Sequence, residues 1–485
     1  MAFDLIIRGG TVVTAADTFA AEIGVRDGKI AALGDDLGTA REVLDATGKL
    51  VLPGGIDSHV HISQPSGPDI VMADDFESAT RSAAFGGNTL VMPFCLQQKG
   101  ESLRTALKSY HELADGKCHI DVSFHLIISD PTTSVLGQEL PALVEDGYTS
   151  FKVFMTYEGL ALADKELLEV FSCARNTGAL VMVHAENYDA IRFLTEQLER
   201  EGKTAPEFHA PSRPIPVERE ATHRAISLAE LIDVPIMIVH VSNGEAMEQI
   251  RWAQNRGLKV YGETCPQYLI LTAKDLEGLN MEGAKYVCSP PPRDAASQLA
   301  CWRGIQTGVF QVFSSDHCPF RYEDAQGKLT PKGRTSFRWV PNGIPGIETR
   351  LPILFSEGVK KGRIDLNTFV ALTATNHAKM YGLYPRKGTI AVGSDADIVI
   401  WDPDKRVTIS QSGMHGGADY TPYEGLEVTG MPITTIVRGR VVVRGGELVG
   451  TIRHGMHLAR ERSVFVRSPS AQAADPFSRQ GLDTA

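Results

Sequence analysis

The stretch GGIDSHVH contains two histidines, His59 and His61, separated by a single residue. On a β-strand, residues i and i+2 share a face, so the two imidazoles would project to the same side. Two imidazoles placed in this way can bind one metal ion. An isolated His-x-His pair is just as compatible with hydrogen-bonded histidines of a protein core, so the pair alone leaves both interpretations open.

Three further polar side chains stand where apolar runs end. His184 lies in VMVHAEN, His240 in IVHVSN and Asp316 in FSSDHCP. If these runs are parallel strands, four histidines and one carboxylate meet at the same edge of the sheet. Nitrogen and oxygen ligands of this kind suit zinc. Each residue taken singly could be structural, but their shared position at strand ends favours a metal site.

Lys152 lies in the apolar segment SFKVFM. An ammonium among phenylalanines and valines would incur a large desolvation penalty, and burial shifts such a lysine toward its neutral form. A neutral amine can react with carbon dioxide, and the resulting carbamate carries two anionic oxygens able to bridge two metal ions. The alternative is a lysine whose aliphatic stem crosses the wall of the fold to reach solvent.

Eight short runs rich in β-branched and apolar residues must position these side chains, and seven longer intervals, mostly helical in pattern, separate them. The runs cover residues 50–57, 88–94, 120–128, 149–155, 180–186, 236–242, 259–265 and 310–316. Strands that alternate with amphipathic helices predict parallel pairing, and eight such units predict an α/β fold, a closed (β/α)8 TIM barrel. Such barrels carry their chemistry on the C-terminal rim.

The two chain ends have a different pattern, with short strands and Asp-Gly or Gly-Gly turns typical of antiparallel hairpins. Neither end is long enough to bury a good core alone. We therefore expect residues 1–52 and 386–458 to combine into one small β-sandwich, with the barrel, residues 53–385, inserted between them. The polar residues 459–485 are expected to form a C-terminal tail that is mobile or contacts other subunits.

The net charge of −11 argues against nucleic-acid and anionic-membrane partners, which require positive potential. No apolar run approaches the roughly 18 residues of a membrane span, and the start, MAFDLIIRGG, lacks the pattern of a secretory signal. Seven cysteines without a Cys-x-x-Cys pair indicate reduced packing residues. We expect a cytoplasmic protein with a small-molecule partner.

The order His-x-His, Lys, His, His, Asp over the first, fourth, fifth, sixth and eighth strands resembles the binuclear amidohydrolases, specifically the hydantoinase and dihydropyrimidinase group of cyclic amidohydrolases. The resemblance covers nearly the whole chain. It includes the motifs GGIDSHVH, DDFESATRSAAFGGNT, TSFKVFMTYEG, LVMVHAEN, IVHVSNGEA, ETCPQYL, SPPPRD, VFSSDHCP, NGIPGIETRL and KGTIAVGSDADIVIWDP. His-x-His alone is a weak signal, whereas this ordered set is specific.

The resemblance implies two divalent metal ions per subunit, for which the ligand types favour Zn²⁺, with a hydroxide spanning them. The ligands would be His59, His61 and Asp316 for the more buried ion, His184 and His240 for the more exposed one, and carbamylated Lys152 for both. Two cations lower the pKa of bound water toward neutrality, and one of them can polarise the amide carbonyl. The resemblance also implies a homotetramer.

Catalytic and substrate-binding roles are likewise implied by the resemblance. Asp316 would carry the proton from the attacking hydroxide to the departing ring nitrogen. Tyr157, five residues after Lys152, would stabilise the developing oxyanion; its alternative is an ordinary interface tyrosine. Ser289 and Asn342 would hold the imide edge of the ring, largely with main-chain groups.

Relatives that open dihydroorotate typically follow the His-x-His motif closely with an arginine, whereas this chain continues ISQPSGPDIVMADD. The missing anion clamp favours a neutral ring, a 5-substituted hydantoin or a 5,6-dihydropyrimidine, opened to an N-carbamoyl amino acid. The residues expected around the ring substituent are Gln64, Pro65, Phe94, Cys95, Phe154 and Leu160. Two alternatives stay open: an allantoinase-like or other cyclic amidohydrolase, and a non-catalytic scaffold, although scaffold paralogues lack several of the six metal residues.

Overall fold

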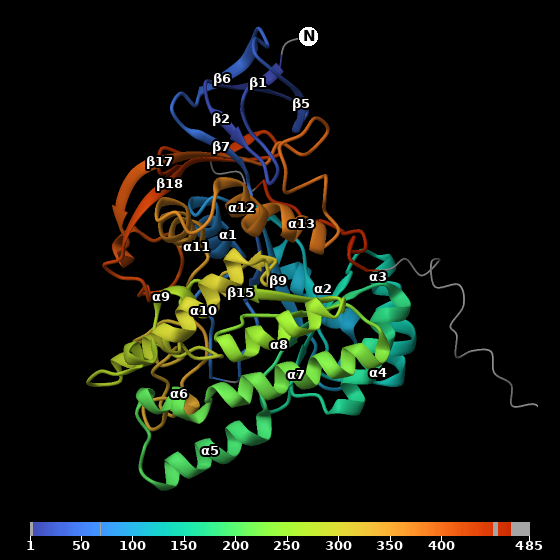
Figure 1. Cartoon of the computed structure of the whole chain (residues 1–485), viewed down its shortest axis with the longest axis vertical. Coiled ribbons are helices and arrows are strands. Elements are labelled where there is room, and N and C mark those ends of the chain that lie inside the picture. The colour runs from blue at the N-terminus through green and yellow to red at the C-terminus, as the bar shows by residue number, and fades with distance from the viewer. Residues whose placement is uncertain (1–2, 68, 450–453, 467–485) are drawn as a thin grey trace, which may run out of the picture.

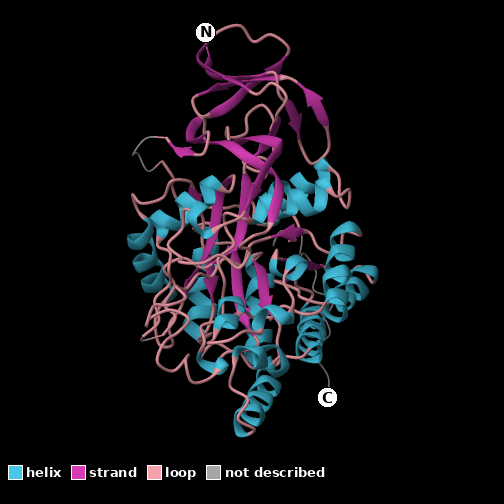
Figure 2. Cartoon of the chain, turned by 90° about the vertical axis from the view of Figure 1, so that its left-hand side faces the viewer, coloured by secondary structure: helices cyan, strands magenta, loops and turns pink. Residues whose placement is uncertain are grey.

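The structure is a computed structural model that describes residues 3–67, 69–449 and 454–466. The middle of the chain forms a barrel surrounded by helices. Both chain ends contribute to a β-rich domain, in which the blue N-terminal strands lie beside the orange-red β17 and β18 at the top of Figure 1. Strands run through the centre of the barrel part and helices surround them (Figure 2).

Eight strand positions form the barrel, and every pair of neighbours in it is parallel. They are β8 (Gly55–Val60), β9 (Asn88–Leu96), β10 (Asp121–Val122) with β11 (His125–Ile127), β12 (Ser150–Phe154), β13 (Leu180–His184), β14 (Ile236–Ile238), β15 (Val260–Thr264) and β16 (Val312–Phe313). One bridge, Val60 to His317, joins the last position to the first. The predicted (β/α)8 barrel is confirmed and is nearly closed.

Alternation along the strands sorts their side chains into two cores. Leu180 and Met182 of β13 pack inside the barrel, whereas Val181 and Val183 pack outward against the helices. All residues of β13 are buried, as expected for a parallel strand covered on both faces. The inner face therefore continues to His184 at the end of the strand, because side chains at every second position share a face.

The helices follow the strands in the order that the sequence pattern predicts. They are α1 (Phe76–Phe85), α2 (Leu103–Ala114), α3 (Leu140–Glu145), α4 (Asp164–Thr177), α5 (Tyr188–Arg200), α6 (His209–Ser212), α7 (Ile215–Ile232), α8 (Gly244–Asn255), α9 (Gln267–Ile270), α10 (Ala295–Gln306), α11 (Arg350–Leu354), α12 (Leu366–Val370) and α13 (Asn376–Met380). Asn187 and Asn243 cap α5 and α8 by accepting a main-chain hydrogen bond. Each cap lies three residues after a predicted ligand histidine, so a helix begins directly after the short segment that follows the histidine.

Two sheets build the β-rich domain, with strand orders β5-β4-β1-β6 and β20-β19-β18-β17-β7-β2-β3. Their bounds are β1 (Phe3–Arg8), β2 (Thr11–Val13), β3 (Thr18–Ala20), β4 (Glu22–Arg26), β5 (Lys29–Gly34), β6 (Ala40–Asp45), β7 (Leu50–Pro53), β17 (Ile398–Thr408), β18 (Glu427–Val437), β19 (Arg440–Arg444) and β20 (Glu447–Leu448). One apolar core holds residues of both sheets and both chain ends, including Ile7 and Ile398. The predicted union of the ends is confirmed.

The run 50–57 does not form one barrel strand, as its composition predicts, but two strands in different sheets. β7 pairs antiparallel with β17 in the β-rich domain, and β8 begins the barrel. The change occurs at Gly54, whose N–H donates to Asp397 O, while Gly55 N–H donates to Gly87 O. A Cβ at Gly54 would lie 2.1 Å from Thr89 Oγ1, so only glycine fits this crossing.

A segment near the C-terminus, residues 454–466, packs against the barrel. Leu458 N–H donates to Val122 O, and the buried Arg460 side chain donates to Phe124 O and Ser150 Oγ. We expected the tail to begin at residue 459; the packed segment continues to residue 466, and residues 467–485 lie outside the described residues.

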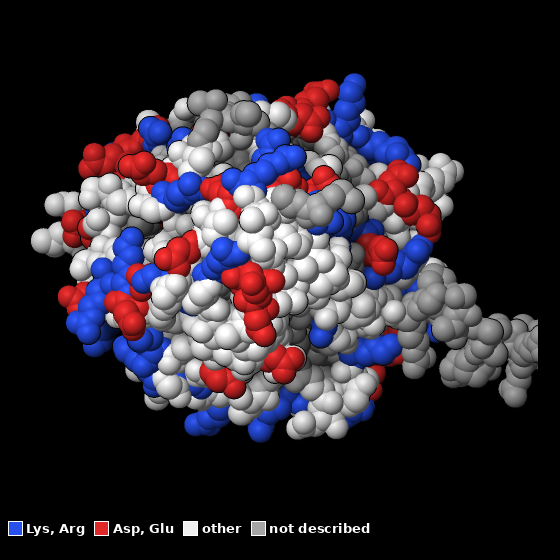
Figure 3. Space-filling view, turned by 90° about the horizontal axis from the view of Figure 1, so that it is seen from above, with Lys and Arg blue, Asp and Glu red and all other residues white. Residues whose placement is uncertain are grey.

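No helix in the described part of the chain is long and apolar enough to cross a membrane. Figure 3 views the molecule from above, the side of the β-rich domain, and there basic and acidic side chains are interspersed, so that the described residues on this face form no continuous basic surface.

Candidate metal centre and substrate cavity

The predicted ligands come together at the carboxyl ends of the barrel strands. A cavity of about 710 Å³ opens there, and all six of them line it: His59, His61, Lys152, His184, His240 and Asp316. These residues are spread over more than 250 positions of the chain, so their convergence follows from the barrel topology and not from local sequence.

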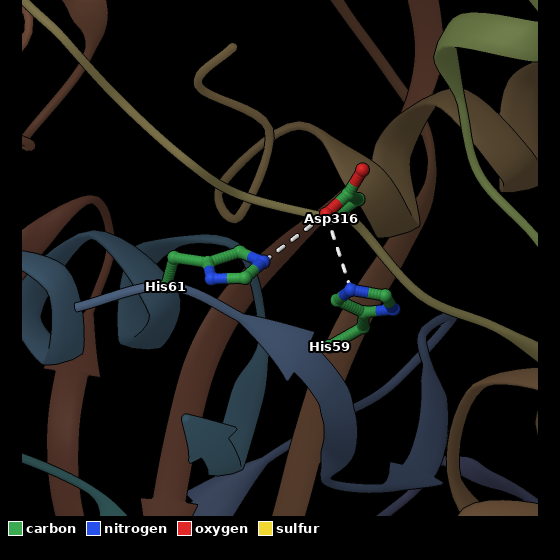
Figure 4. Close-up of side chains that lie close together, drawn as sticks. All are labelled: His59, His61 and Asp316. Atoms are coloured by element: carbon green, nitrogen blue, oxygen red, sulfur yellow. Dashed lines mark ion pairs between the residues drawn. The ribbon is translucent and has the colours of Figure 1, made fainter. Parts of the chain in front are cut away.

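Asp316 faces both histidines of the opening motif. Its Oδ1 lies 3.2 Å from His59 Nε2 and 3.6 Å from His61 Nε2 (Figure 4). One ligand atom from each of the three buried side chains lies within 4.8 Å of the others. The three residues therefore form a possible metal-binding group, of the mixed nitrogen and oxygen type that divalent ions such as zinc prefer.

The backbone adopts an unusual conformation at two of the rim residues. Asp316 has φ 52° and His240 has φ 42°, in the left-handed region that residues other than glycine seldom enter. Such conformations cost of order 1–3 kcal/mol each and persist where the surrounding structure holds them, most often at functional sites.

Lys152 is fully buried on the inner face of β12, so its side chain does not reach solvent. Its Nζ lies 3.4 Å from His59 Nε2 and about 5 Å from the ring centres of Phe94 and Phe154. Among the described residues no carboxylate lies within ion-pair distance of it. Burial lowers the pKa of Lys152 to about 8, against the opposing charges of Glu263 and Asp316, which makes the neutral amine accessible near neutral pH.

His184 and His240 form the second half of the centre. His240 Nε2 lies 2.9 Å from His184 Nδ1, and His184 Nε2 lies 2.7 Å from Glu186 Oε2. Burial lowers the pKa of both imidazoles, and the neutral form is the one that binds metals. His240 Nδ1 is buried and has no hydrogen-bond partner among the described residues.

Two buried carboxylates behind the histidines were missed by the sequence reasoning. Glu263 Oε1 lies 2.6 Å from His59 Nδ1 and accepts the His240 N–H at 3.0 Å; Glu186 contacts His184 and Arg213. Burial raises the pKa of Glu263 to about 7, while Lys152 opposes that shift. The available signal was a carboxylate at the end of an apolar run, in YGET and VMVHAE.

These contacts test whether the residues fit a metal. His59, His61 and His184 each direct one ring nitrogen to an oxygen outside the centre. These oxygens belong to Glu263, Gln64 and Glu186, respectively. The opposite nitrogen of each ring then faces the shared centre. An outer acceptor of this kind fixes the tautomer and leaves the inner nitrogen free to bind a metal. The residues present therefore fit a divalent ion.

The predicted substrate residues have two outcomes. Those that line the cavity are Tyr157, Ser289, Asn342, Gln64, Pro65, Phe154 and Leu160; Phe94 and Cys95 are absent from its lining. β9 continues to Leu96, beyond the run 88–94, so Phe94 packs inside the barrel under the His59 ring and Cys95 packs outward in the helix-facing core. Leu96 takes the place at the cavity wall.

Tyr157 stands beside the second half of the centre. Its ring centre lies 5.3 Å from that of His184, and the Arg213 guanidinium lies 5.7 Å from the ring centre. Burial raises the pKa of Tyr157 well above its ordinary value, against the opposing effect of Arg213. The phenol therefore keeps its proton at neutral pH and can donate a hydrogen bond into the cavity.

A parallel barrel with a buried His-His-Asp group at its C-terminal rim defines the class of metal-dependent barrel enzymes. The model of the Amidohydrolase family matches residues 50–442. The chain therefore belongs to the amidohydrolase family.

Relatives place the chain within that family. It is 49% identical to the D-hydantoinase of Geobacillus stearothermophilus, covering 94% of this chain and 96% of the relative. It is 40% identical to the dihydropyrimidinase of Rattus norvegicus, with 94% and 89% covered. The solved dihydropyrimidinase structure from Brevibacillus agri superposes with a TM-score of 0.92 at 47% identity, covering 95% and 99%. The expected hydantoinase and dihydropyrimidinase group, and hence a hydrolase of cyclic amides, is confirmed.

Proposed function

We propose that this chain opens the rings of 5-substituted hydantoins and 5,6-dihydropyrimidines by hydrolysing a cyclic amide bond, which gives N-carbamoyl amino acids. One observation carries the proposal: the six predicted ligands line the same cavity as Tyr157, Ser289 and Asn342. The names of the relatives support it, since they include both D-hydantoinase and dihydropyrimidinase.

Two divalent ions, Zn²⁺ on the chemistry of the donors, would be held by His59, His61 and Asp316 on one side and His184 and His240 on the other. Bound there, they would supply Lewis-acid activation of a water and of the amide carbonyl. Lys152 would bridge them as a carbamate. Its burial, its lowered pKa and the absence of a described carboxylate partner support that assignment.

Asp316 is suited to move the proton. Burial opposes ionisation, but His59 and His61 hold its pKa below the ordinary value, so it is a carboxylate at neutral pH. It accepts the proton from the attacking water and returns it to the leaving ring nitrogen. Tyr157 donates a hydrogen bond to the oxygen on which negative charge develops. Main-chain groups of Ser289 and Asn342 hold the imide edge.

The charges around the cavity favour a neutral ring. Two cationic side chains line it among the described residues: Lys152 belongs to the metal centre, and Arg338 is paired with Glu199 at 3.1 Å. No lining arginine is thus left for a substrate carboxylate such as that of dihydroorotate. The ring substituent would lie against the predicted loop residues Gln64, Pro65 and Leu160.

A kinetic panel on zinc-loaded protein tests this function. It compares 5,6-dihydrouracil, hydantoins with small and aromatic 5-substituents, and allantoin. Ring opening of the first two classes, lost on chelation and restored by zinc, is the expected result. Preference for allantoin would favour the allantoinase-like alternative. No more than trace metal and no activity after expression with adequate zinc would favour the non-catalytic scaffold.

Two further parts of the proposal concern the cell and the assembly. All seven cysteines are free thiols, as a reducing compartment such as the cytoplasm maintains. The proposed homotetramer predicts a mass of four times 52.7 kDa in light scattering; a monomer mass would contradict it.

A further inference from the structure

Two loops bring Ser289 and Asn342 to the wall of the cavity. The loops are joined by a main-chain hydrogen bond from Gly343 N–H to Val287 O, 3.0 Å long. Val287 lies two residues before Ser289, and Gly343 directly follows Asn342. The distance between the two loops therefore decides the distance between the two residues proposed to hold the ring.

A lysine outside the metal centre binds both loops. Lys328 has no exposed surface, and its Nζ donates to Val287 O at 2.7 Å and to Pro341 O at 2.6 Å. Among the described residues no carboxylate lies within ion-pair distance of this ammonium; the ionisable groups that interact with it are the thiols of Cys288 and Cys318 and the imidazole of His209. Two carbonyl oxygens, one from each loop, are its polar partners.

Another buried lysine outside the metal centre, Lys387, provides a contrast. Lys387, between barrel strand β10 and the segment that leads into β17, is also buried, but its Nζ contacts three carboxylates, those of Asp121, Asp395 and Asp397. Charge on Lys387 is thus compensated. Burial lowers the pKa of Lys328 to about 7 instead. Burying a lysine without a carboxylate partner costs free energy. The two hydrogen bonds to the carbonyls of Val287 and Pro341 give a structural reason for a lysine at this position.

We propose that Lys328 is a positioning residue for substrate recognition, which ties the carbonyls of Val287 and Pro341 together and thereby sets the spacing between Ser289 and Asn342. This inference rests on the proposed function, because it assigns those two residues to the imide edge of the ring. Hydrogen bonds to the imide edge act in the bound substrate as well as in the transition state. Loosening the two loops should therefore raise KM and leave kcat nearly unchanged.

The test is Lys328→Met, which fills the same apolar space but cannot donate. The matched control is Lys405→Met, the same change at an exposed position on β17 that does not line the cavity. We expect KM for the best ring of the panel to rise roughly tenfold, since the two hydrogen bonds that tie the loops together are lost, with kcat within about twofold. Hydrogen exchange of peptides that cover residues 287–290 and 340–343 should become faster than in wild type, and unchanged in the control.

Unchanged KM in Lys328→Met overturns the inference, as does a fall in kcat with KM unchanged. If the methionine variant does not accumulate as folded protein, Lys328→Gln replaces it; the shorter, uncharged side chain does not reach both carbonyl oxygens, and an unaltered KM there overturns the inference equally. Wild-type protein that opens no ring in the panel refutes the proposed function instead. Hydrogen exchange still decides in that case whether Lys328 holds the two loops.

Discussion

Glu263 Oε1 lies 2.6 Å from His59 Nδ1, and the same oxygen accepts the main-chain N–H of His240 at 3.0 Å. One buried carboxylate thus orients ligands that come from two different strands, one in each half of the proposed centre. Its second oxygen accepts the Ser314 hydroxyl at 2.8 Å. The carboxylate is fully buried, so solvent does not screen it and a change of its charge affects His59 and His240 directly.

Glu263→Gln tests this relationship. The amide keeps the shape and an acceptor oxygen but removes the negative charge that favours the inward lone pair of His59. Zinc affinity should fall by about 10–100-fold, the usual effect of losing such a partner. Competition with a chromogenic chelator measures it. Glu348→Gln is the matched control, because Glu348 contacts His415 at 2.7 Å and is not among the residues that line the centre. Equal zinc affinity in both variants would contradict the orienting role.

Lys152→Ala tests the proposed bridge. Loss of the carbamate should reduce bound zinc below two ions per subunit and lower kcat by at least about a hundredfold. A short carboxylic acid such as propionate can occupy the vacated space with two oxygens, and partial recovery of both quantities is expected.

The control for this variant is Lys165→Ala, at a side chain that is 87% exposed on α4. Full zinc content and full activity in Lys152→Ala, without added acid, would refute the bridging assignment. Recovery of zinc content by propionate distinguishes loss of the bridging ligand from misfolding, because the added acid would not restore zinc binding to a misfolded protein.

Tyr157→Phe removes one hydrogen-bond donor and keeps the ring that packs against Phe154 and His184. Because a donor to the developing oxyanion acts in the transition state, kcat should fall by about 10²–10³-fold with little change in KM. Tyr261→Phe, at a half-buried ring that packs on Phe465 away from the cavity, is the control. A rise in KM alone would assign Tyr157 to ground-state binding.

Much of this site can be predicted from the sequence because the carboxyl ends of all strands in a parallel barrel lie on the same rim. Alternation along LVMVHAE places His184 on the inner face, and the same rule places Lys152 inward between Phe151 and Val153, which pack outward. The rule requires correct strand limits. The run 88–94 predicts a strand that ends at Phe94, which would bring Phe94 and Cys95 to the ring substituent, whereas β9 continues to Leu96.

Other features depend on contacts that a linear pattern does not contain. Glu263 and Glu186 are acidic residues at the ends of apolar runs, and only the neighbouring strands show that each meets a histidine. The division of residues 50–57 between two sheets depends on β17, more than 340 residues away in the chain. Lys328 lies in a segment without periodicity, so its two carbonyl partners were not predictable.

The stability of the protein should depend on pH through His209, a buried residue whose Nε2 lies 2.8 Å from Cys288 O, next to Ser289. Burial, and secondarily the charge of Arg213, lowers the pKa of His209 to about 3 from its ordinary value of 6.5. The unfolded chain therefore binds a proton between those values that the folded chain does not. Its contribution to stability is complete above pH 6.5 and is lost as the pH falls toward 3, by up to about 1.4 kcal/mol per pH unit.

His209→Gln keeps an N–H donor for the Cys288 carbonyl but removes the titration, so it isolates this effect from the other buried histidines. Comparing denaturant unfolding of the variant and the wild type at pH 7.5 and pH 5.5 cancels every titration that the two proteins share. At pH 7.5 the imidazole is neutral in the folded and the unfolded wild type, so its burial requires no deprotonation, and the variant should be the less stable protein. On acidification the variant should lose less stability than the wild type. A stability difference that is the same at both pH values would mean that His209 takes up its proton without unfolding, and the enclosed environment inferred for this side of the cavity would be wrong.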